Sequence, residues 1–153
     1  MNAEDRMNAE DRMNAEDRQA IVDLTIAYTW AIDGHHWEAL RDIFLPDATA
    51  LLVDERVGIE SIIERISGAL TPLDSSQHLI GNHQVRIDGD RATCRCYLQA
   101  QHVRQAAPGG PNFIFAGTYE DEIERTPAGW RIRRRVLSNI WTEGNPAVVG
   151  RRS

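Results

Sequence analysis

The hydrophobic period of this sequence changes near its middle, and that change restricts the fold more than any other feature. In the first half, apolar residues recur at helical spacing, and the predicted helices cover 16–33, 37–44 and 58–70. In the second half they alternate every two residues, and the predicted strands cover 76–88, 91–104, 112–126 and 129–142, after a short strand at 48–53. Helices followed by successive antiparallel strands predict an α+β domain, with N-terminal helices packed on one curved antiparallel sheet.

Alternation within the long strands predicts which side chains face the interior. In the strand 91–104, the inward-facing residues are Ala92, Cys94, Cys96, Leu98, Ala100 and His102. In the strand 112–126, they are Phe113, Phe115, Gly117, Tyr119 and Ile123. Small residues on one strand beside aromatic residues on the next suit a pocket as well as a packed core. Both cysteines are predicted to be small buried residues.

The N-terminus contains the hexapeptide Met-Asn-Ala-Glu-Asp-Arg three times in succession, from residue 1 to residue 18. Six residues advance a helix by about 600°, so equivalent residues drift around the axis and form no continuous apolar stripe. The segment can be helical, but it has little to bury. We therefore expect residues 1–12 to be an extension outside the fold, residues 13–145 to form the domain, and residues 146–153 to be a C-terminal tail.

Composition excludes several functional classes. All 17 basic residues are arginine, and a chain without lysine cannot form a Schiff base through a lysine amine. The net charge of −6 argues against nucleic acid as a partner. No segment has the roughly 20 consecutive apolar residues that a membrane span needs, and the N-terminus is unlike a secretory signal, so we expect a cytoplasmic protein. No glycine-rich phosphate loop or dinucleotide-binding motif is present, and no cofactor is expected.

Three polar residues at apolar positions need an explanation. Asp33 ends a helix that is apolar on most of its circumference, so its carboxylate is either paired inside the protein or solvated at the turn before Gly34. His78 lies at the entry to a strand and His102 on an inward face, where each could also be an ordinary core histidine. A buried Asp can orient an imidazole so that its second nitrogen takes a proton from a substrate. No histidine or cysteine spacing indicates a metal site, and none is expected.

Four segments resemble one known superfamily. They are Tyr-Thr-Trp-Ala-Ile-Asp-Gly-His-His-Trp at 28–37, Gln-His-Leu-Ile-Gly-Asn at 77–82, Gly-Thr-Tyr-Glu-Asp-Glu-Ile-Glu-Arg at 117–125 and Gly-Trp-Arg-Ile at 129–132. Their order and spacing over residues 16–142 are similar to SnoaL-like proteins, which share their fold with nuclear transport factor 2 and the ketosteroid isomerases. The best match is the branch of scytalone dehydratase and hexachlorocyclohexane dehydrochlorinase. The resemblance implies a cone-shaped barrel, also described as a cystatin-like roll.

In that branch an Asp–His dyad carries out the chemistry, and the resemblance places it at Asp33 and His78. It also implies pocket roles for Tyr28, His102 and Arg135. Two departures restrict the transfer of an exact activity. Ile32 stands where the dehydratase has a second tyrosine, and Tyr28 stands where the dehydrochlorinase has a lysine.

The resemblance and the alternation disagree on one arginine. Strict alternation from Trp130 and Ile132 points Arg134 inward, whereas the resemblance assigns Arg135 to the pocket. A β-bulge within 133–135 would bring the two into agreement.

The leading hypothesis is a cofactor-independent lyase or isomerase that abstracts a proton from a small, mostly apolar, cyclic substrate. His78 would be the base and Asp33 its orienting partner, while Tyr28, His102 or Arg135 would polarise a carbonyl or a leaving group. The remaining predicted pocket residues are Trp30, Leu98, Phe113, Phe115 and Tyr119. A binding module without activity and an assembly protein are the alternatives, since one fold hosts many functions. Contact between Asp33 and His78 in an apolar pocket would favour the enzyme.

We also expect a homo-oligomer, either a trimer or a dimer. Its interface would be the outer face of the sheet, where the predicted outward residues are Arg95, Tyr97, Gln99, Leu137 and Trp141.

Overall fold

The chain forms a mixed α+β structure, as its change of period predicts. A computed structural model describes residues 2–150, and the side chains of that range apart from those of residues 4–7. The elements are α1 (Ala3–Asp33), η1 (Trp37–Asp42), β1 (Phe44–Leu51), β2 (Glu55–Val57), α2 (Ile59–Leu70), β3 (Ser75–Asp88), β4 (Arg91–Val103), β5 (Asn112–Thr126), β6 (Gly129–Gly144) and η2 (Pro146–Val149). The four long strands agree with their predicted ranges to within two residues. The predicted second helix is a shorter 3₁₀ turn, and β2 was not expected.

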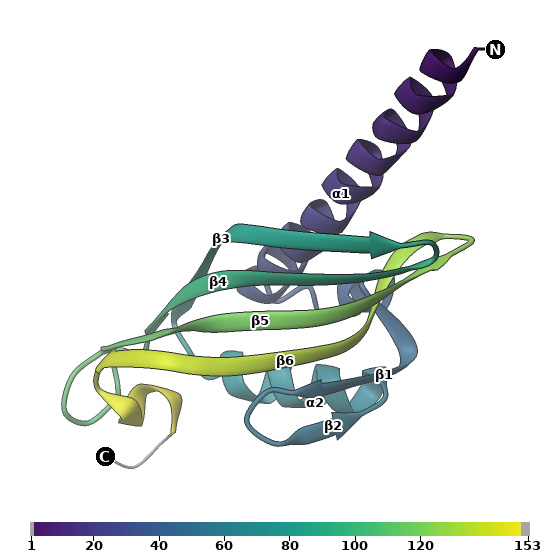
Figure 1. Cartoon of the computed structure of the whole chain (residues 1–153). Coiled ribbons are helices and arrows are strands. Elements are labelled where there is room, and N and C mark those ends of the chain that lie inside the picture. The colour runs from purple at the N-terminus through teal and green to yellow at the C-terminus, as the bar shows by residue number, and fades with distance from the viewer. Residues whose placement is uncertain (1, 151–153) are drawn as a thin grey trace.

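The six strands form one curved sheet in the order β2-β1-β6-β5-β4-β3 (Figure 1). The strands β3 to β6 pair antiparallel, as predicted, but β1 pairs parallel to β6. The curved antiparallel sheet predicted for the four long strands is therefore confirmed, and the parallel pair of β1 with β6 is an addition that the sequence pattern did not predict. The chain passes through α2 from β2 to β3, and these two edge strands do not pair with each other. Among residues 2–150, the sheet curves without closing into a complete barrel.

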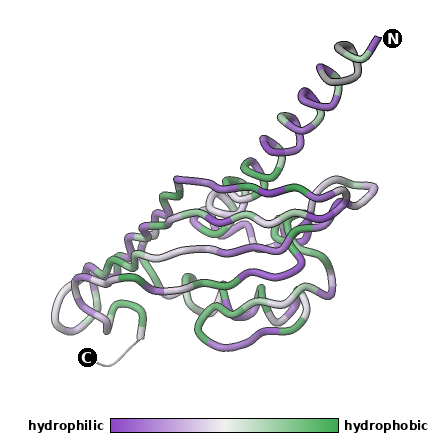
Figure 2. Tube along the Cα trace, viewed as in Figure 1, coloured by the Kyte–Doolittle hydropathy of each residue, from purple (hydrophilic) through white to green (hydrophobic). Residues whose placement is uncertain are grey.

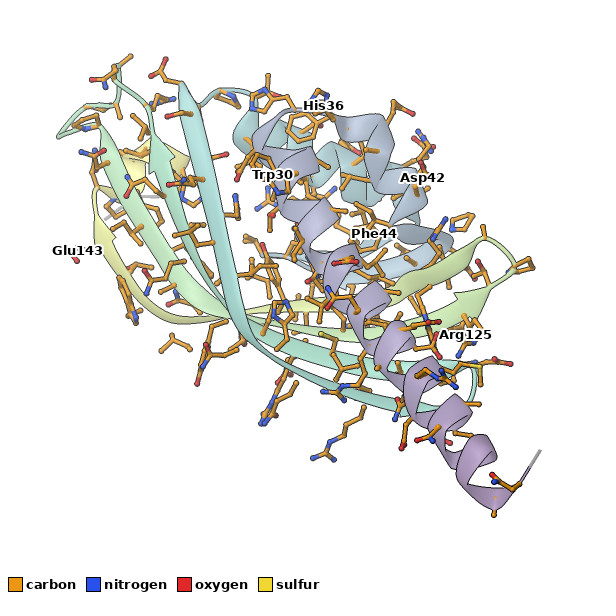
Figure 3. All side chains as sticks on the ribbon, turned by 90° about the horizontal axis from the view of Figure 1, so that it is seen from above. Trp30, His36, Asp42, Phe44, Arg125 and Glu143 are labelled. Atoms are coloured by element: carbon orange, nitrogen blue, oxygen red, sulfur yellow. The ribbon has the colours of Figure 1, made fainter. Side chains whose placement is uncertain are left out.

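The core lies between the concave face of the sheet and the helices. In α2 the buried stripe is Ile59, Ile62, Ile66 and Leu70, at the spacing of one helical face. The C-terminal half of α1 buries Ile21, Leu24, Tyr28 and Ile32. Figure 3 shows α1 lying across the sheet, with Trp30 near its C-terminal end and Arg125 beside its N-terminal half. The predicted inward residues of β4 and β5 are all buried, which confirms their phase.

A β-bulge in β6 decides which of its arginines faces the core. Ile132 pairs with Ile123 and Arg134 pairs with Glu122, so Arg133 is the extra residue on the bulged strand. The extra residue reverses the alternation after it. Arg135 is consequently fully buried, whereas Arg134 lies on the outer side and bonds Glu55.

The N-terminal part of α1 projects beyond the sheet. Figure 2 shows this part of the helix to be mainly hydrophilic, and the side chains of residues 8–16 are exposed. The first strong anchor is Asp17, which accepts two hydrogen bonds from Arg125, at 2.9 and 2.7 Å, and one from Trp130 Nε1 at 3.1 Å. The Arg125 bonds hold the pKa of Asp17 below its ordinary value despite partial burial. No helix within the described residues is both long and apolar enough to cross a bilayer.

We predict that deletion of residues 1–12 leaves thermal stability almost unchanged. Every described side chain in the deleted segment is exposed, and surface changes of this kind cost at most about 0.5 kcal/mol, or roughly 2 °C in a chain of this size. The control is Asp17→Ala, which removes the anchor to Arg125 and Trp130 and should lower the melting temperature by several degrees. Differential scanning calorimetry measures both. A loss of several degrees in the deletion variant would show that the repeats dock on the domain.

Candidate functional site

The carboxylate of Asp33 is held by the first residues of β3. Its Oδ1 accepts a hydrogen bond from the Ser76 hydroxyl at 2.8 Å, and its Oδ2 accepts one from the His78 backbone N–H at 2.7 Å. Nδ1 of His78 lies 2.6 Å from Oδ1. The side chains of Asp33 and His78 are 20% and 7% exposed. Asp33 is therefore an internally partnered residue, and the alternative of a solvated helix-end residue is wrong.

The protonation of this pair follows from its hydrogen bonds. Burial alone would raise the pKa of Asp33, but the hydrogen bonds from His78 and Ser76 and the proximity of the imidazole outweigh it, so the pKa is lowered. The carboxylate is thus ionised at neutral pH and must accept from its partners. Nδ1 of His78 consequently donates to the carboxylate, and whenever the ring carries a single proton its Nε2 has a free lone pair. Within residues 2–150, no group is hydrogen-bonded to Nε2.

His78 lies in the wall of a cavity of about 320 Å³ between the sheet and α2. The cavity is at the lower end of the range of small-molecule pockets. Five predicted pocket residues besides His78 and His102 line it: Tyr28, Leu98, Phe113, Phe115 and Tyr119. The opposite wall includes Leu52, Ile66, Ala69, Leu70, Val148 and Val149, from the turn after β1, from α2 and from η2. Most of the lining side chains are apolar, and the polar ones include His78, His102, Arg65 and Arg104.

The second histidine of the cavity remains neutral. The His102 ring lies 5.8 Å from the His78 ring, nearly perpendicular to it, and its Nδ1 donates to the Phe113 carbonyl oxygen at 3.3 Å. Burial lowers the pKa of His102 to about 4, and the neighbouring His78 acts in the same direction. His102 therefore contributes a neutral polar ring, and it adds no positive charge to the cavity at neutral pH.

Two tyrosines separate the cavity from a buried ion pair. Arg135 donates from Nε and Nη2 to the two carboxylate oxygens of Asp121, both at 2.8 Å, and the pair is fully buried. The guanidinium carbon lies 4.2 Å from the Tyr28 ring centre and 4.0 Å from that of Tyr119. Such cation–π contacts fix the position of both rings. Burial raises the pKa of each tyrosine, so both remain neutral phenols that can donate hydrogen bonds.

The structure corrects three sequence predictions. Trp30 is 75% exposed on the outer side of α1 and does not line the cavity, because a helix with many apolar residues still keeps one face towards solvent (Figure 3). Arg135 faces inward, as the resemblance implies, but it lies behind Tyr28 and Tyr119 and does not line the cavity. Leu137 lines the cavity rather than facing outward, because the bulge at Arg133 reverses the phase of β6.

Sequence reasoning missed three polar residues of the site: Ser76, Arg65 and Arg104. Ser76 could have been found, since it lies two residues before His78 and thus on the same face of β3. Arg104 likewise lies two residues after His102 and continues the inward face of β4. The position of Arg65 on α2 has no such signal, because it depends on how α2 packs over the sheet.

The structure indicates no other reactive centre within the described residues. Burial raises the pKa of Cys94 to about 12 and that of Cys96 to about 11, so both thiols remain protonated and inert. Within residues 2–150, no three His, Cys, Asp or Glu side chains form a group that could hold a metal ion.

Comparison with known proteins identifies related chains. A family model of the SnoaL-like domain matches residues 13–136. The uncharacterised protein Rv2910c of Mycobacterium tuberculosis is 36% identical over 123 residues, which cover 76% of this chain and 80% of that protein. A candidate scytalone dehydratase from Novosphingobium aromaticivorans is 22% identical, with a TM-score of 0.79 over 94% of this chain and 99% of its own. A hexachlorocyclohexane dehydrochlorinase, LinA type 2, is 19% identical, with a TM-score of 0.76 over 88% and 91%. At these identities the two structures show a shared fold.

We predict that His102 makes the stability of the protein depend on pH between about 6.5 and 4. An unfolded histidine binds a proton near pH 6.5, whereas folded His102 binds one only near pH 4. The unfolded state therefore binds more protons in this window, and stability falls as the pH decreases. The penalty at pH 4.5 is roughly 2–3 kcal/mol, since pH 4.5 lies two units below 6.5 and each unit contributes about 1.36 kcal/mol.

Urea unfolding of wild type and His102→Gln at pH 7 and pH 4.5 measures this difference. Glutamine can still donate to the Phe113 carbonyl but does not titrate, so the variant should lose less stability on acidification. Gln99→Ala, on the outer face of β4, should lose as much stability on acidification as the wild type does. Equal acid sensitivity in His102→Gln and wild type would contradict the burial argument.

Proposed function

The chain belongs to the SnoaL-like family, and from this premise we propose that it is a cofactor-independent lyase or isomerase with His78 as its general base. The single observation that carries the proposal is the geometry of the Asp33–His78 pair. Asp33 fixes the imidazole with its proton on Nδ1, and Nε2 faces an apolar cavity that has room for a small cyclic molecule. A neutral imidazole with a free Nε2 is suited to take a proton from a carbon acid.

The chemistry would begin with removal of a proton next to a carbonyl or a leaving group. Nε2 of His78 would accept the proton, and the ionised carboxylate of Asp33 would stabilise the imidazolium that forms. Tyr28 and Tyr119 would donate hydrogen bonds to the oxygen or leaving group on which negative charge develops. Return of the proton to another carbon gives an isomerase, and loss of a β substituent gives a lyase.

The structural relatives support this reaction class. The names of two proteins with the same fold, a candidate scytalone dehydratase and a dehydrochlorinase, both describe eliminations. An assembly protein would be expected to have a filled interior, whereas this chain has a cavity. A binding module without activity would not need the hydrogen-bonded Asp33–His78 pair. These features favour the enzyme over the binding module and the assembly protein.

We predict that Asp33→Asn and His78→Ala each reduce proton abstraction by about 10²–10⁴-fold. The assay follows hydrogen–deuterium exchange at the carbon next to the carbonyl of small cyclic β-hydroxyketones in D₂O by NMR, which detects lyases and isomerases alike. The double variant should lose no more than the stronger single one, because the two residues act as a unit. His36→Ala, an exposed change outside the cavity, is the matched control.

Folding of each variant must be checked by near-ultraviolet circular dichroism. One amide oxygen cannot accept all three hydrogen bonds that Asp33 receives, so Asp33→Asn should lose about 1–3 kcal/mol of stability. Full exchange activity in folded Asp33→Asn, or none in the wild type with any ketone that binds, would contradict the proposed function and favour the binding module.

We further propose that the chain self-associates through an outer apolar patch of Leu79, Tyr97, Ile140 and Trp141. These side chains lie on β3, β4 and β6, and they are 61%, 54%, 58% and 41% exposed. Contiguous exposed apolar residues of this kind are typical of interfaces.

We predict that the wild type sediments as a dimer or trimer at micromolar concentration and that Tyr97→Glu with Ile140→Glu gives a monomer. The glutamates would place charges in the apolar contact. Thr93→Glu, on the same face near the other end of β4, should leave the assembly intact. A wild type that sediments as a monomer in analytical ultracentrifugation would contradict the proposed interface.

A further inference from the structure

The charged residues that line the cavity are all cationic. Arg65 and Arg104 lie in its wall, and none of the described lining residues is an aspartate or a glutamate. Neither histidine adds an unbalanced positive charge to the cavity, because His78 is paired with Asp33 and the lowered pKa of His102 keeps that ring neutral. An apolar substrate alone would not require arginines at this place.

The two arginines differ in whether their charge is already balanced. Nε of Arg65 lies 3.3 Å from Oδ1 of Asp54, which forms an ion pair at the rim. Arg104 forms no ion pair within the described part of the chain. Asp74 lies opposite the same end of β4, but its Oδ2 accepts from the Gln105 backbone N–H at 2.6 Å and does not pair with Arg104.

One donor of Arg104 lacks any acceptor. Its Nε is shielded from solvent and has no hydrogen-bond partner within residues 2–150, while the side chain as a whole is partly exposed. A buried N–H without an acceptor is costly, so an occupied cavity is expected to supply one. A carboxylate can accept from Nε and a terminal nitrogen of one guanidinium at once, which is the geometry that an unpaired arginine offers.

The backbone positions Arg104 on the same side of the sheet as the proposed base, one end of the cavity away from it. It follows His102 at the two-residue spacing of the inward face of β4, and the Arg104 N–H donates to the Pro111 carbonyl oxygen at 2.9 Å. In the sheet, Ser76 pairs with His102 and His78 pairs with Ala100. Arg104 thus lies just past the C-terminal end of β4, four residues beyond Ala100, the partner of His78. A small molecule could contact both residues with its opposite ends.

We propose that the natural ligand is a small cyclic carboxylic acid whose carboxylate is bound by Arg104 and whose ring occupies the apolar cavity. The proposal names the class of substrate that the site binds. It rests on the proposed function in one respect, which is that the ligand binds in this cavity. The partial exposure of Arg104 allows the carboxylate to keep part of its hydration, which reduces the desolvation penalty of bringing an ion to an apolar cavity.

The experiment compares carboxylates with their neutral amides of the same shape. The probes are cyclohexanecarboxylate, benzoate and 2-naphthoate, each with its carboxamide, and dissociation constants come from isothermal titration calorimetry or ligand-observed NMR. For at least one pair, the wild type should bind the carboxylate at least about tenfold more tightly, as expected for a charge-assisted pair. Arg104→Gln should bind that carboxylate no better than the amide.

Two further variants make the outcome specific. Arg65→Gln, whose arginine is already paired with Asp54, should change the preference less than about threefold. His78→Ala should keep the preference for the carboxylate although it removes the proposed base, so failure of the proposed chemistry and failure of this inference are distinguishable. The inference is overturned if the wild type binds each amide as tightly as its carboxylate, binds none of the probes, or keeps the preference in Arg104→Gln.

Discussion

The hydrogen bonds that Asp33 accepts from Ser76 and His78 hold the last turn of α1 against the start of β3. A half-buried carboxylate is stable there only because backbone, hydroxyl and imidazole donors all point at it. The same bonds determine the tautomer of His78 and turn Nε2 towards the cavity. The hydrogen bonds that attach α1 to β3 are therefore also the ones that allow His78 to accept a proton. Asp33 is needed both for the packing of the helix on the sheet and for the proposed chemistry.

The bulge at Arg133 has a comparable effect on the other side of the cavity. It turns Arg135 inward to pair with Asp121, and it brings Leu137 into the cavity wall. A buried ion pair contributes little net stability, because the desolvation penalty offsets the attraction between the charges. Its consequence here is positional, since the guanidinium packs against both tyrosine rings that face the cavity. Arg135 thus orients Tyr28 and Tyr119 from behind.

Much of this arrangement could be predicted from the sequence because it depends on local periodicity. The helical stripe of α2 and the two-residue alternation of β4 each determine which residues are buried, and the SnoaL-like resemblance, confirmed by the family match, brought Asp33 and His78 together. Trp30 and Leu137 were predicted wrongly for different reasons. The exposed side of α1 depends on how the helix sits on the sheet, and the phase of β6 depends on one extra residue. The parallel pairing of β1 with β6 is a long-range contact that no local pattern encodes.

The central claim is that His78 presents an unprotonated Nε2 to the cavity because Asp33 holds the proton on Nδ1. Nitrogen-15 chemical shifts of the histidine rings in labelled protein at pH 8 test it most directly, with Asp33→Asn for comparison and His78→Gln to assign the signals. The account predicts a protonated Nδ1 and an unprotonated Nε2 for His78 in the wild type, and a weaker preference for this tautomer in Asp33→Asn. A wild-type His78 with its proton on Nε2 would contradict the account, since the nitrogen facing the cavity could not then accept a proton from a substrate.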